Sequence, residues 1–310
     1  MSLISAGFVG RTRQRGIWRT LKQAVGKLIL EPISERLTAF RIRHVPSFVG
    51  PTKNDLLQIE EALRVLGVEV RCLAPEVAAF EDFKDAFIFP DAYHGGKAGG
   101  VYDEKRLEHF LAYSLCSLGE PQKKLTYVDV AAGSSPWVRM LRSFGYEAYA
   151  IDLAIKPGFG HLGYYLKMDA TALAFADESI DALSLQCAFE MFAGDSDVRF
   201  LDECRRVLRP GGVVVISPLY MHTHHCGYAS PEYWGKGFAD KEGLEYVQRG
   251  VRGIPFSRKY SPHTLAARIL KRIVENGMTY ELYRLTNQAC LGDNIYCHFV
   301  LAVRKPYAQS

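Results

Sequence analysis

The chain has 310 residues, of which 23% are charged and 48% are hydrophobic, with a formal net charge of +4. This composition is typical of a globular protein and excludes disordered, collagen-like and coiled-coil chains. No apolar run approaches the roughly 18 residues that a membrane-spanning helix needs. The seven cysteines are scattered without a CxxC pair, which argues against a disulfide framework or a zinc ribbon and favours a cytoplasmic protein of enzyme size.

The positive charge is concentrated at the N-terminus. Residues 1–45 hold nine Lys or Arg against two Glu, a balance of +7, so the remaining residues carry −3. Apolar residues recur there at helical spacing between basic ones, the pattern of an amphipathic helix. Two placements are open: the helix packs on the body with its charges in water, or residues 11–43 make peripheral contact with an anionic membrane at its inner face.

The N-terminal third is predicted to be mainly helical. We expect a helix over 54–66, capped by Asn54 and Asp55, and a short strand in VEVRCLAP. The Gly- and Pro-rich segment 89–100 is predicted to be a loop, followed by an amphipathic helix over 102–118. We assign residues 1–100 to a helical, basic extension with a substrate loop.

From residue 125 the pattern alternates between strands and helices. This alternation indicates an α/β fold with a parallel sheet covered on both faces. Sheets of this kind bind ligands at the carboxyl ends of their strands. The predicted strands are LTYVDVA, EAYAIDL, YYLKMDA, IDALSLQC and VVVISPL, and the predicted helices cover 136–145 and 197–212.

The C-terminal part contains an insertion and a final strand pair. Residues 218–263 are rich in aromatic residues, Gly and His, and so long a segment after a core strand favours a substrate-binding insertion. A helix over 265–277 should follow. YELYRLT and YCHFVLAVRK then predict a β-hairpin at the edge of the sheet. The main domain therefore spans 101–310.

Small residues follow the first core strand in TYVDVAAGSSPW, where a ligand can approach the backbone closely. Ala131, Gly133 and Pro136 occupy the positions that a dinucleotide fingerprint fills with glycines. The missing glycines and the carboxylate of Asp129 disfavour a pyrophosphate and hence a nicotinamide dehydrogenase. A ligand without phosphates fits better.

Polar residues end the next three strands. Asp152 can accept hydrogen bonds from both hydroxyls of a ribose. Asp169 and the backbone of Ala170 can recognise the amino group and ring nitrogen of an adenine. Gln186 lies beside the same crevice at the end of the fourth strand.

Five motifs together resemble the class I S-adenosylmethionine-dependent methyltransferases: DVAAGSSP, the strand ending at Asp152, KMDATAL, SIDALSLQCAFEMF and ECRRVLRPGGVVVIS. They cover about residues 125–217, and they depart from the family where alanine and serine replace two glycines. The resemblance implies a Rossmann-like, mostly parallel seven-stranded sheet, S-adenosylmethionine as the cofactor, and methyltransferase activity. The cofactor-binding residues that it implies are Asp129, Ala131 and Gly133 for the methionine part, Asp152 for the ribose, and Asp169 and Ala170 for the adenine. Leu153 and Gln186 are also expected to contact the cofactor.

A narrower resemblance involves the segments that flank this core. FPDAYHGGKAGGVYDEKRLEHFL, SPLYMHTHHCGYASPEYWGKG and IPFSRKYS are similar to methyltransferases associated with bacterial surface-polysaccharide synthesis. That similarity implies O-methylation of a sugar or other small-molecule hydroxyl in polysaccharide biosynthesis. Nucleic acid is a less favoured acceptor because the body is slightly acidic. An RNA methyltransferase and an inactive methyltransferase-like binding scaffold remain the alternatives.

Transfer to a hydroxyl needs a base, and the candidates are His222, His224 and Glu190. The histidines of HTHH are alternatively loop hydrogen-bonding groups, or a metal site with Asp195 or Asp197. Glu190 alternatively orients the substrate or caps a helix. No fixed ligand spacing supports a metal site, so the sequence assigns none.

Overall fold

The computed structural model describes residues 31–96, 100–120, 124–236, 240 and 243–307. By its internal contacts the chain divides into two compact units, a smaller one (1–48, 228–238 and 245–255) and a larger one with the remaining residues. Most of the predicted basic helix of the N-terminal arm lies outside the described residues. Among the helices that the structure describes, none is long and apolar enough to cross a membrane.

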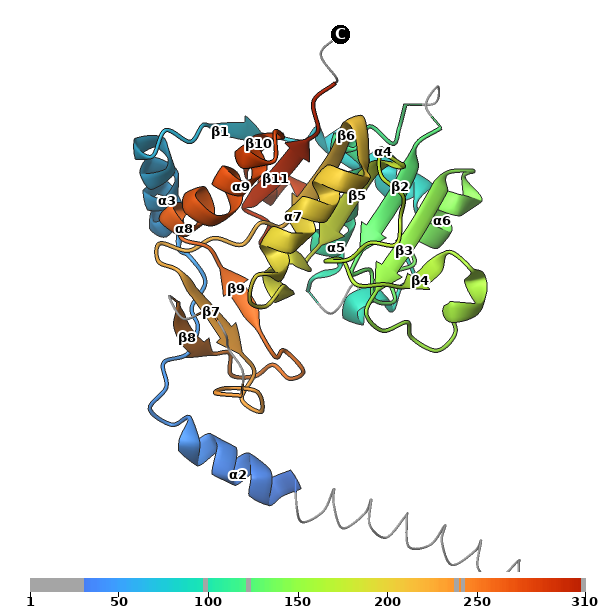
Figure 1. The fold of residues 1–310 in the computed structure, drawn as a ribbon. Coiled ribbons are helices and arrows are strands. Elements are labelled where there is room, and N and C mark those ends of the chain that lie inside the picture. The colour runs from blue at the N-terminus through green and yellow to red at the C-terminus, as the bar shows by residue number, and fades with distance from the viewer. Residues whose placement is uncertain (1–30, 97–99, 121–123, 237–239, 241–242, 308–310) are drawn as a thin grey trace, which may run out of the picture. The chain divides into compact units, whose positions relative to one another are not determined.

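The larger unit is built on an eight-stranded sheet (Figure 1). Strand β11 runs antiparallel to both of its neighbours, and every other neighbouring pair is parallel. In spatial order the strands are β1 (Val70–Leu73), β10 (Thr279–Leu285), β11 (Phe299–Arg304), β6 (Leu208–Ser217), β5 (Ile180–Gln186), β2 (Thr126–Val130), β3 (Glu147–Asp152) and β4 (Tyr165–Lys167).

Helices cover both faces of this sheet, as the alternation of strands and helices predicts. One face packs against α3 (Lys53–Val65), α7 (Ser196–Val207) and the segment Leu265–Glu275, and the other packs against α4 (Val77–Ala86), α5 (Tyr102–Leu115) and α6 (Trp137–Ser143). Successive side chains of β6 point to opposite faces of the sheet. Val214 and Ile216 pack in the core beside α3 and α7, whereas Val213 and Val215 pack in the core beside α4, α5 and α6.

The remaining helical pieces are short. Residues 262–275 form one continuous helical region with a π-helical middle, α8 (Pro262–Thr264), η6 (Leu265–Leu270) and α9 (Lys271–Glu275). The others are α10 (Gln288–Leu291) and the 3₁₀ turns η2 (Tyr93–Gly95), η4 (Gly160–Leu162) and η5 (Phe189–Met191).

The α/β fold and the mostly parallel sheet are confirmed, but the expected strand count of seven is wrong. The eighth strand is β1, which pairs in parallel with β10 from Val70 opposite Leu282 to Leu73 opposite Leu285. The last two strands pair antiparallel as predicted. They do not form the edge of the sheet, because β1 covers β10, and α10 lies in their connection.

The larger unit begins at Val49, so residues 49–100 belong to it. The main domain was predicted to begin only at residue 101. Helix α3 begins one residue before the expected cap. Thr52 is the N-cap and forms a capping box with Asp55, in which each side chain accepts from the other residue's backbone N–H. Threonine is the better cap here because its hydroxyl reaches the third helical residue.

The insertion at 218–263 contains three strands, β7 (Cys226–Ala229), β8 (Leu244–Val247) and β9 (Ser257–Lys259), in a sheet of order β8-β7-β9. The division between the units falls within β7 and β8. The smaller unit also contains α2 (Glu31–Arg41). In this unit the Arg249 guanidinium donates to the carbonyls of Ile42 and Val45 at 2.7 and 2.9 Å.

Candidate active site

A cavity of about 500 Å³ lies at the carboxyl edge of the sheet, where β2, β3, β4 and β5 end. The chain proceeds from β2 outward through β3 to β4 and then returns to β5 on the other side of β2. Ligands of open α/β sheets bind in the crevice at such a reversal of strand order. The lining residues are Ala131, Ile151, Asp152, Leu153, Met168, Asp169, Ala170, Thr171, Cys187, Ala188, Met191, Phe192, Ala193 and Ser196.

The loop after β2 turns sharply through two left-handed residues, Ala131 at φ 56° and Gly133 at φ 58°. An L-residue in this conformation costs about 1–2 kcal/mol, so the alanine at a position where the family favours glycine is strained. The Gly133 N–H donates to Asp152 Oδ2 at 2.9 Å, and the Ala154 N–H donates to Asp152 Oδ1 at 3.0 Å. Asp152 is thus fixed at the cavity wall, with lone pairs left on both oxygens.

Asp129, in β2, is a buried carboxyl group with 1% of its surface exposed. Neither of its oxygens has a hydrogen-bond partner among the described residues. Burial, and secondly the charge of Asp152, raises the pKa of Asp129 well above its usual range. An unpartnered buried carboxyl group is costly, so the site favours a cationic or hydrogen-bond-donating ligand group beside it.

Asp169 follows β4, the strand next to β3, and also lines the cavity. Its Oδ1 accepts from the Thr171 N–H at 2.8 Å and from the Thr171 hydroxyl at 2.9 Å. These bonds, the backbone one first, lower the pKa of Asp169, so it is ionised at neutral pH. The Asx turn leaves Oδ2 available to a donor in the cavity.

Five of the predicted cofactor-binding residues line the cavity, namely Ala131, Asp152, Leu153, Asp169 and Ala170. Asp129 and Gly133 lie in the strand and loop behind this wall. The Gln186 amide donates to Ser184 Oγ at 2.6 Å, and the next residue, Cys187, lines the cavity in its place. The apolar lining, above all Met168, Met191 and Phe192, was not predicted, although these residues lie within the motifs KMDATAL and SIDALSLQCAFEMF, because apolar side chains in such segments are equally expected in the core.

A cluster of buried ionisable side chains lies on α5, in the helix predicted to be amphipathic. Lys105 Nζ donates to both oxygens of Glu108, at 2.8 and 3.0 Å, and both residues are buried. Burial opposes the charge on Lys105, but the Glu108 carboxylate prevails and keeps the pKa of Lys105 well above its usual range. Glu104, also buried, accepts from the backbone of Tyr296 and Cys297, and burial raises its pKa to about 7.

Glu190 connects this cluster to the cavity. Its side chain is 6% exposed, its Oε1 accepts from Cys187 Sγ at 3.4 Å, and its Oε2 has no partner among the described residues. Cys187 Sγ also lies 3.3 Å from the Tyr220 hydroxyl. The predicted helix-capping role is not seen, because Glu190 lies inside the short turn η5.

Lys259 supplies a second buried cation on the other side of Tyr220. Its Nζ lies 3.6 Å from the centre of the Tyr220 ring and donates to Ser257 Oγ at 3.0 Å. Burial lowers the pKa of Lys259 to about 8, although the nearby Glu190 and Cys187 act in the opposite direction. Carboxylates, ammonium groups and a phenol therefore meet beside the Cys187 wall of the cavity.

The other two predicted bases, His222 and His224, do not line the cavity. His222 Nε2 lies 3.3 Å from the carbonyl oxygen of Val49, and the two imidazole rings are 4.3 Å apart. Both rings influence Asp55 at the start of α3, whose pKa is lowered chiefly by the Thr52 hydroxyl. None of the three predicted bases lines the cavity itself, but Glu190 lies directly behind the wall, in contact with the lining residue Cys187.

Asp197 does not join the histidines, so the alternative metal site with this residue is wrong. Its buried carboxylate accepts from Arg268 Nε at 2.8 Å and from the Tyr260 hydroxyl at 2.6 Å, and it pairs with Arg258. Asp195 pairs with Arg199 on the same helix. Both carboxylates are engaged in structural ion pairs.

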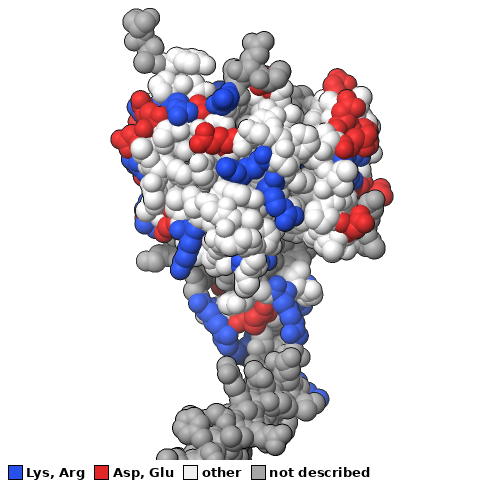
Figure 2. All heavy atoms as spheres, turned by 90° about the vertical axis from the view of Figure 1, so that its right-hand side faces the viewer, with Lys and Arg blue, Asp and Glu red and all other residues white. Residues whose placement is uncertain are grey.

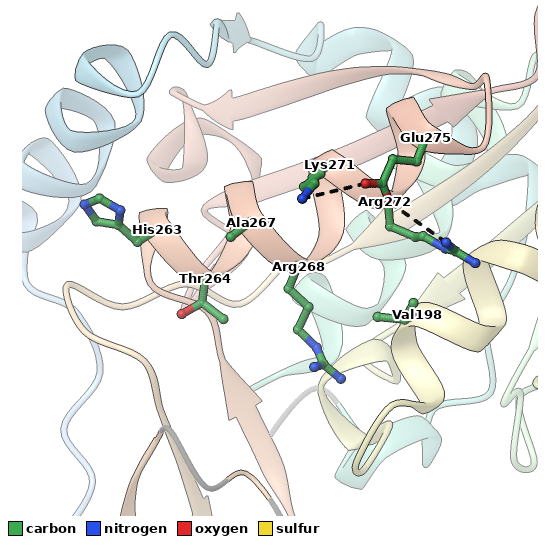
Figure 3. A pocket seen from close by; sticks show the side chains of 8 residues that line it. All are labelled: Val198, His263, Thr264, Ala267, Arg268, Lys271, Arg272 and Glu275. Atoms are coloured by element: carbon green, nitrogen blue, oxygen red, sulfur yellow. Dashed lines mark ion pairs between the residues drawn. The ribbon is translucent and has the colours of Figure 1, made fainter.

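A second cavity, of about 610 Å³, lies along α8, η6 and α9 (Figure 3). Its basic residues are neutralised by neighbours. Lys271 Nζ and Arg272 Nη1 lie 3.7 and 3.9 Å from the Glu275 carboxylate, and Arg268 pairs with Asp197. This cavity therefore offers no strong anion site, and the cavity at the sheet edge is the better candidate for the cofactor.

Comparison with known families matches residues 128–216 to the model described as a methyltransferase domain. The chain contains a methyltransferase domain. The matched segment begins in β2 and ends in β6, and so contains the strands and loops that build the cavity. S-adenosylmethionine is the cofactor of this domain. No curated protein matches the chain.

Several solved structures resemble the methyltransferase domain and its surroundings. A Burkholderia thailandensis 1,6-didemethyltoxoflavin-N1-methyltransferase with bound S-adenosylhomocysteine is 17% identical, with 77% of this chain and 93% of that chain covered and a TM-score of 0.45. A Mesorhizobium loti S-adenosylmethionine-dependent methyltransferase is 16% identical, with 62% and 95% covered and a TM-score of 0.42. Likenesses at this level assign no substrate.

The described residues fit this cofactor. Asp129 offers an unpartnered carboxyl group that the ammonium of the methionine part would satisfy. The cavity wall offers carboxylate oxygens of Asp152 and Asp169 to hydroxyl and amino donors, with apolar surface between them.

We predict that Asp129→Asn stabilises the ligand-free methyltransferase at pH 8. Because its pKa in the folded state is raised, wild-type Asp129 contributes stability at low pH that is lost as the pH rises through that pKa. The amide carries no such dependence. Urea unfolding of both proteins between pH 5 and pH 8 should show the variant gaining relative stability as the pH increases. A difference that shrinks with rising pH would contradict this account.

Proposed function

We propose that this methyltransferase methylates a hydroxyl group of a sugar or another small polyhydroxylated molecule, in glycan biosynthesis. The observation that carries the proposal is the Glu190 carboxylate, buried beside the cofactor cavity with Oε2 unpartnered among the described residues. A carboxylate in this position can accept a proton from an acceptor hydroxyl.

On this proposal each cofactor part has its own residues. Asp129 balances the ammonium, Asp152 accepts from the ribose hydroxyls, and Asp169 with Ala170 binds the adenine edge. Bound S-adenosylmethionine supplies a sulfonium methyl group, whose transfer forms a C–O bond, breaks the C–S bond and yields S-adenosylhomocysteine.

The chain's own contribution is to hold the acceptor and take its proton. Glu190 Oε2 receives the hydroxyl proton, while the Cys187 thiol contacts the carboxylate through Oε1. Tyr220 and Tyr296 stack with ring centres 6.3 Å apart and planes at 17°, and Lys259 Nζ lies over the Tyr220 ring, so these aromatic side chains form a rigid support beside Glu190. Positioning the hydroxyl in line with the methyl group is the larger part of the rate enhancement.

Charge argues for a neutral acceptor rather than RNA. Glu104, Glu108 and Glu190 place three carboxyl groups near one another, with Lys105 paired to Glu108 and Lys259 near Glu190, so the cluster has no excess of cations to attract phosphates. On the face drawn in Figure 2, basic side chains are scattered among acidic ones rather than gathered into a stripe. A phosphate-binding surface needs a basic stripe or patch.

We predict that Glu190→Gln lowers turnover by roughly 10²- to 10⁴-fold, the usual contribution of a general base. The affinity for S-adenosylhomocysteine should stay unchanged, because the substitution keeps the side-chain shape. Methyl-labelled S-adenosylmethionine is offered with nucleotide sugars, free glycans and bulk tRNA, and labelled products are separated. We expect alkali-stable methyl ethers in the sugar fractions.

The matched control is Glu275→Gln. Glu275 is exposed and does not line the cofactor cavity, so this variant should keep full activity. Labelled tRNA with unlabelled sugars would show the RNA alternative to be correct. Binding of S-adenosylhomocysteine without any labelled product would favour the scaffold alternative. Full activity of Glu190→Gln would refute the proposed role of Glu190 as the base, but not the proposed acceptor.

We also propose that residues 11–43 contact an anionic membrane peripherally. In the described part of this segment, Leu37 and Phe40 are each 62% exposed, beside the exposed Arg36 and Arg41. The Arg43 guanidinium lies 4.0 Å from the centre of the Phe40 ring. Apolar groups bordered by arginines suit the boundary between lipid headgroups and acyl chains.

Replacing Arg36, Arg41 and Arg43 by serine should weaken binding to phosphatidylglycerol vesicles at least tenfold, since each basic residue contributes about 1 kcal/mol near an anionic surface. Co-sedimentation measures the loss, with phosphatidylcholine vesicles as the neutral reference. Equal binding of wild type and variant to the anionic vesicles would contradict membrane contact through this segment.

A further inference from the structure

His222, His224 and Cys226 bring three metal-binding side chains together outside the cofactor cavity. One donor atom from each residue lies within 4.8 Å of the donor atoms of the other two. The backbone bends at Thr223 and His224, which places the two imidazoles 4.3 Å apart at 70°. Three donors within five residues therefore converge without long-range rearrangement.

The surrounding backbone holds this segment in place. The His222 N–H donates to the Tyr260 carbonyl at 2.9 Å, and the Tyr260 N–H donates to the Tyr220 carbonyl at 3.1 Å. Cys226 begins β7 and is fully buried. A segment anchored at both ends presents its donors with little conformational freedom left to lose.

The histidine contacts are those of metal ligands oriented by a second hydrogen bond. His222 Nε2 lies 3.3 Å from the Val49 carbonyl, so Nε2–H can donate there, while Nδ1 lies 3.2 Å from the Thr223 hydroxyl and would exchange that contact for the metal. His224 Nδ1 lies 3.3 Å from the same Thr223 hydroxyl, which therefore orients both imidazole rings. Such outer contacts fix the tautomer and ring direction of ligating imidazoles.

The donor chemistry selects the metal. We infer that His222, His224 and Cys226 form a binding site for a divalent transition-metal ion, Zn²⁺ in a cell, with one coordination position open. Two imidazoles and a thiolate suit Zn²⁺ and exclude Mg²⁺ and Ca²⁺, which prefer oxygen. Tetrahedral geometry with bonds of about 2.0–2.3 Å puts neighbouring donors about 3.5 Å apart, so the three must close by about 1 Å.

Nearby charges define the fourth position. Asp55, at the start of α3, interacts electrostatically with both histidines and can supply an oxygen or hold a bound water. Lys259 is the neighbouring cation, and it acts on Cys226. Burial raises the pKa of the Cys226 thiol to about 12 and the charge of Lys259 only partly opposes this, so a metal ion must displace the thiol proton as it binds. The ion would also fasten the segment that carries Tyr220 beside the acceptor site.

Metal loading of the full-length protein tests this site independently of activity. After removal of metal by a chelator, Co²⁺ is titrated in under reducing conditions and followed by absorption. We expect one equivalent to bind, with d–d bands of tetrahedral intensity and a thiolate-to-cobalt charge-transfer band. Zn²⁺ should displace the Co²⁺ and abolish both.

The variants assign the ligands. Cys226→Ser should remove the charge-transfer band, and His224→Ala should weaken Co²⁺ binding at least tenfold while the band persists at high Co²⁺ concentration. The matched controls Cys72→Ser and His161→Ala replace exposed residues elsewhere and should behave as wild type. Absence of the charge-transfer band in wild type, or its survival in a folded Cys226→Ser protein, would overturn the inference. If Cys226→Ser does not fold, the Co²⁺ titration of His224→Ala becomes the test of the site. Binding as tight as in the wild type would then overturn the inference.

Discussion

The central sheet is buried on both faces, and this constraint determines where polar chemistry can lie. Its central strands are lined by apolar side chains that alternate between the two helical layers, so the carboxyl group of Asp129 in β2 is shut off from water. The carboxyl edge is the exception. There β2, β3, β4 and β5 end together, and the loops that leave them carry the acidic residues of the cavity. One architectural feature thus gathers residues that are distant in the sequence.

Charges that remain buried near this edge need partners, and the structure supplies them unevenly. Asp197 is fully balanced by Arg258, Arg268 and Tyr260, which is the behaviour of a structural ion cluster. Asp129 and one oxygen of Glu190 have no partner among the described residues. Because an unpartnered buried carboxyl group destabilises a protein, its retention is better explained by a ligand than by folding.

The sequence predicted the sheet core and the acidic wall because both follow local rules. Asp152 and Asp169 end strands whose β-pattern is clear, and parallel strands must end at one edge. The cluster on α5 could not be predicted, since Lys105 and Glu108 are spaced like an exposed helical ion pair, and only tertiary packing buries them. The same holds for β1, whose four residues look like an isolated strand until β10 pairs with them. Long-range contacts, absent from any local pattern, decided these features.

The most direct measurement for the central claim is calorimetric titration of S-adenosylhomocysteine into the purified protein, with Asp152→Asn and Asp85→Asn compared under the same conditions. Asp152 lines the cavity, whereas Asp85 is exposed on α4 away from it. We expect one ligand per chain, unchanged affinity in Asp85→Asn, and at least a tenfold weaker affinity in Asp152→Asn, which corresponds to about 1.4 kcal/mol. NAD should give no heat of binding. Equal affinity of all three proteins for S-adenosylhomocysteine, or binding of NAD alone, would contradict the placement of the cofactor at the carboxyl edge of the sheet.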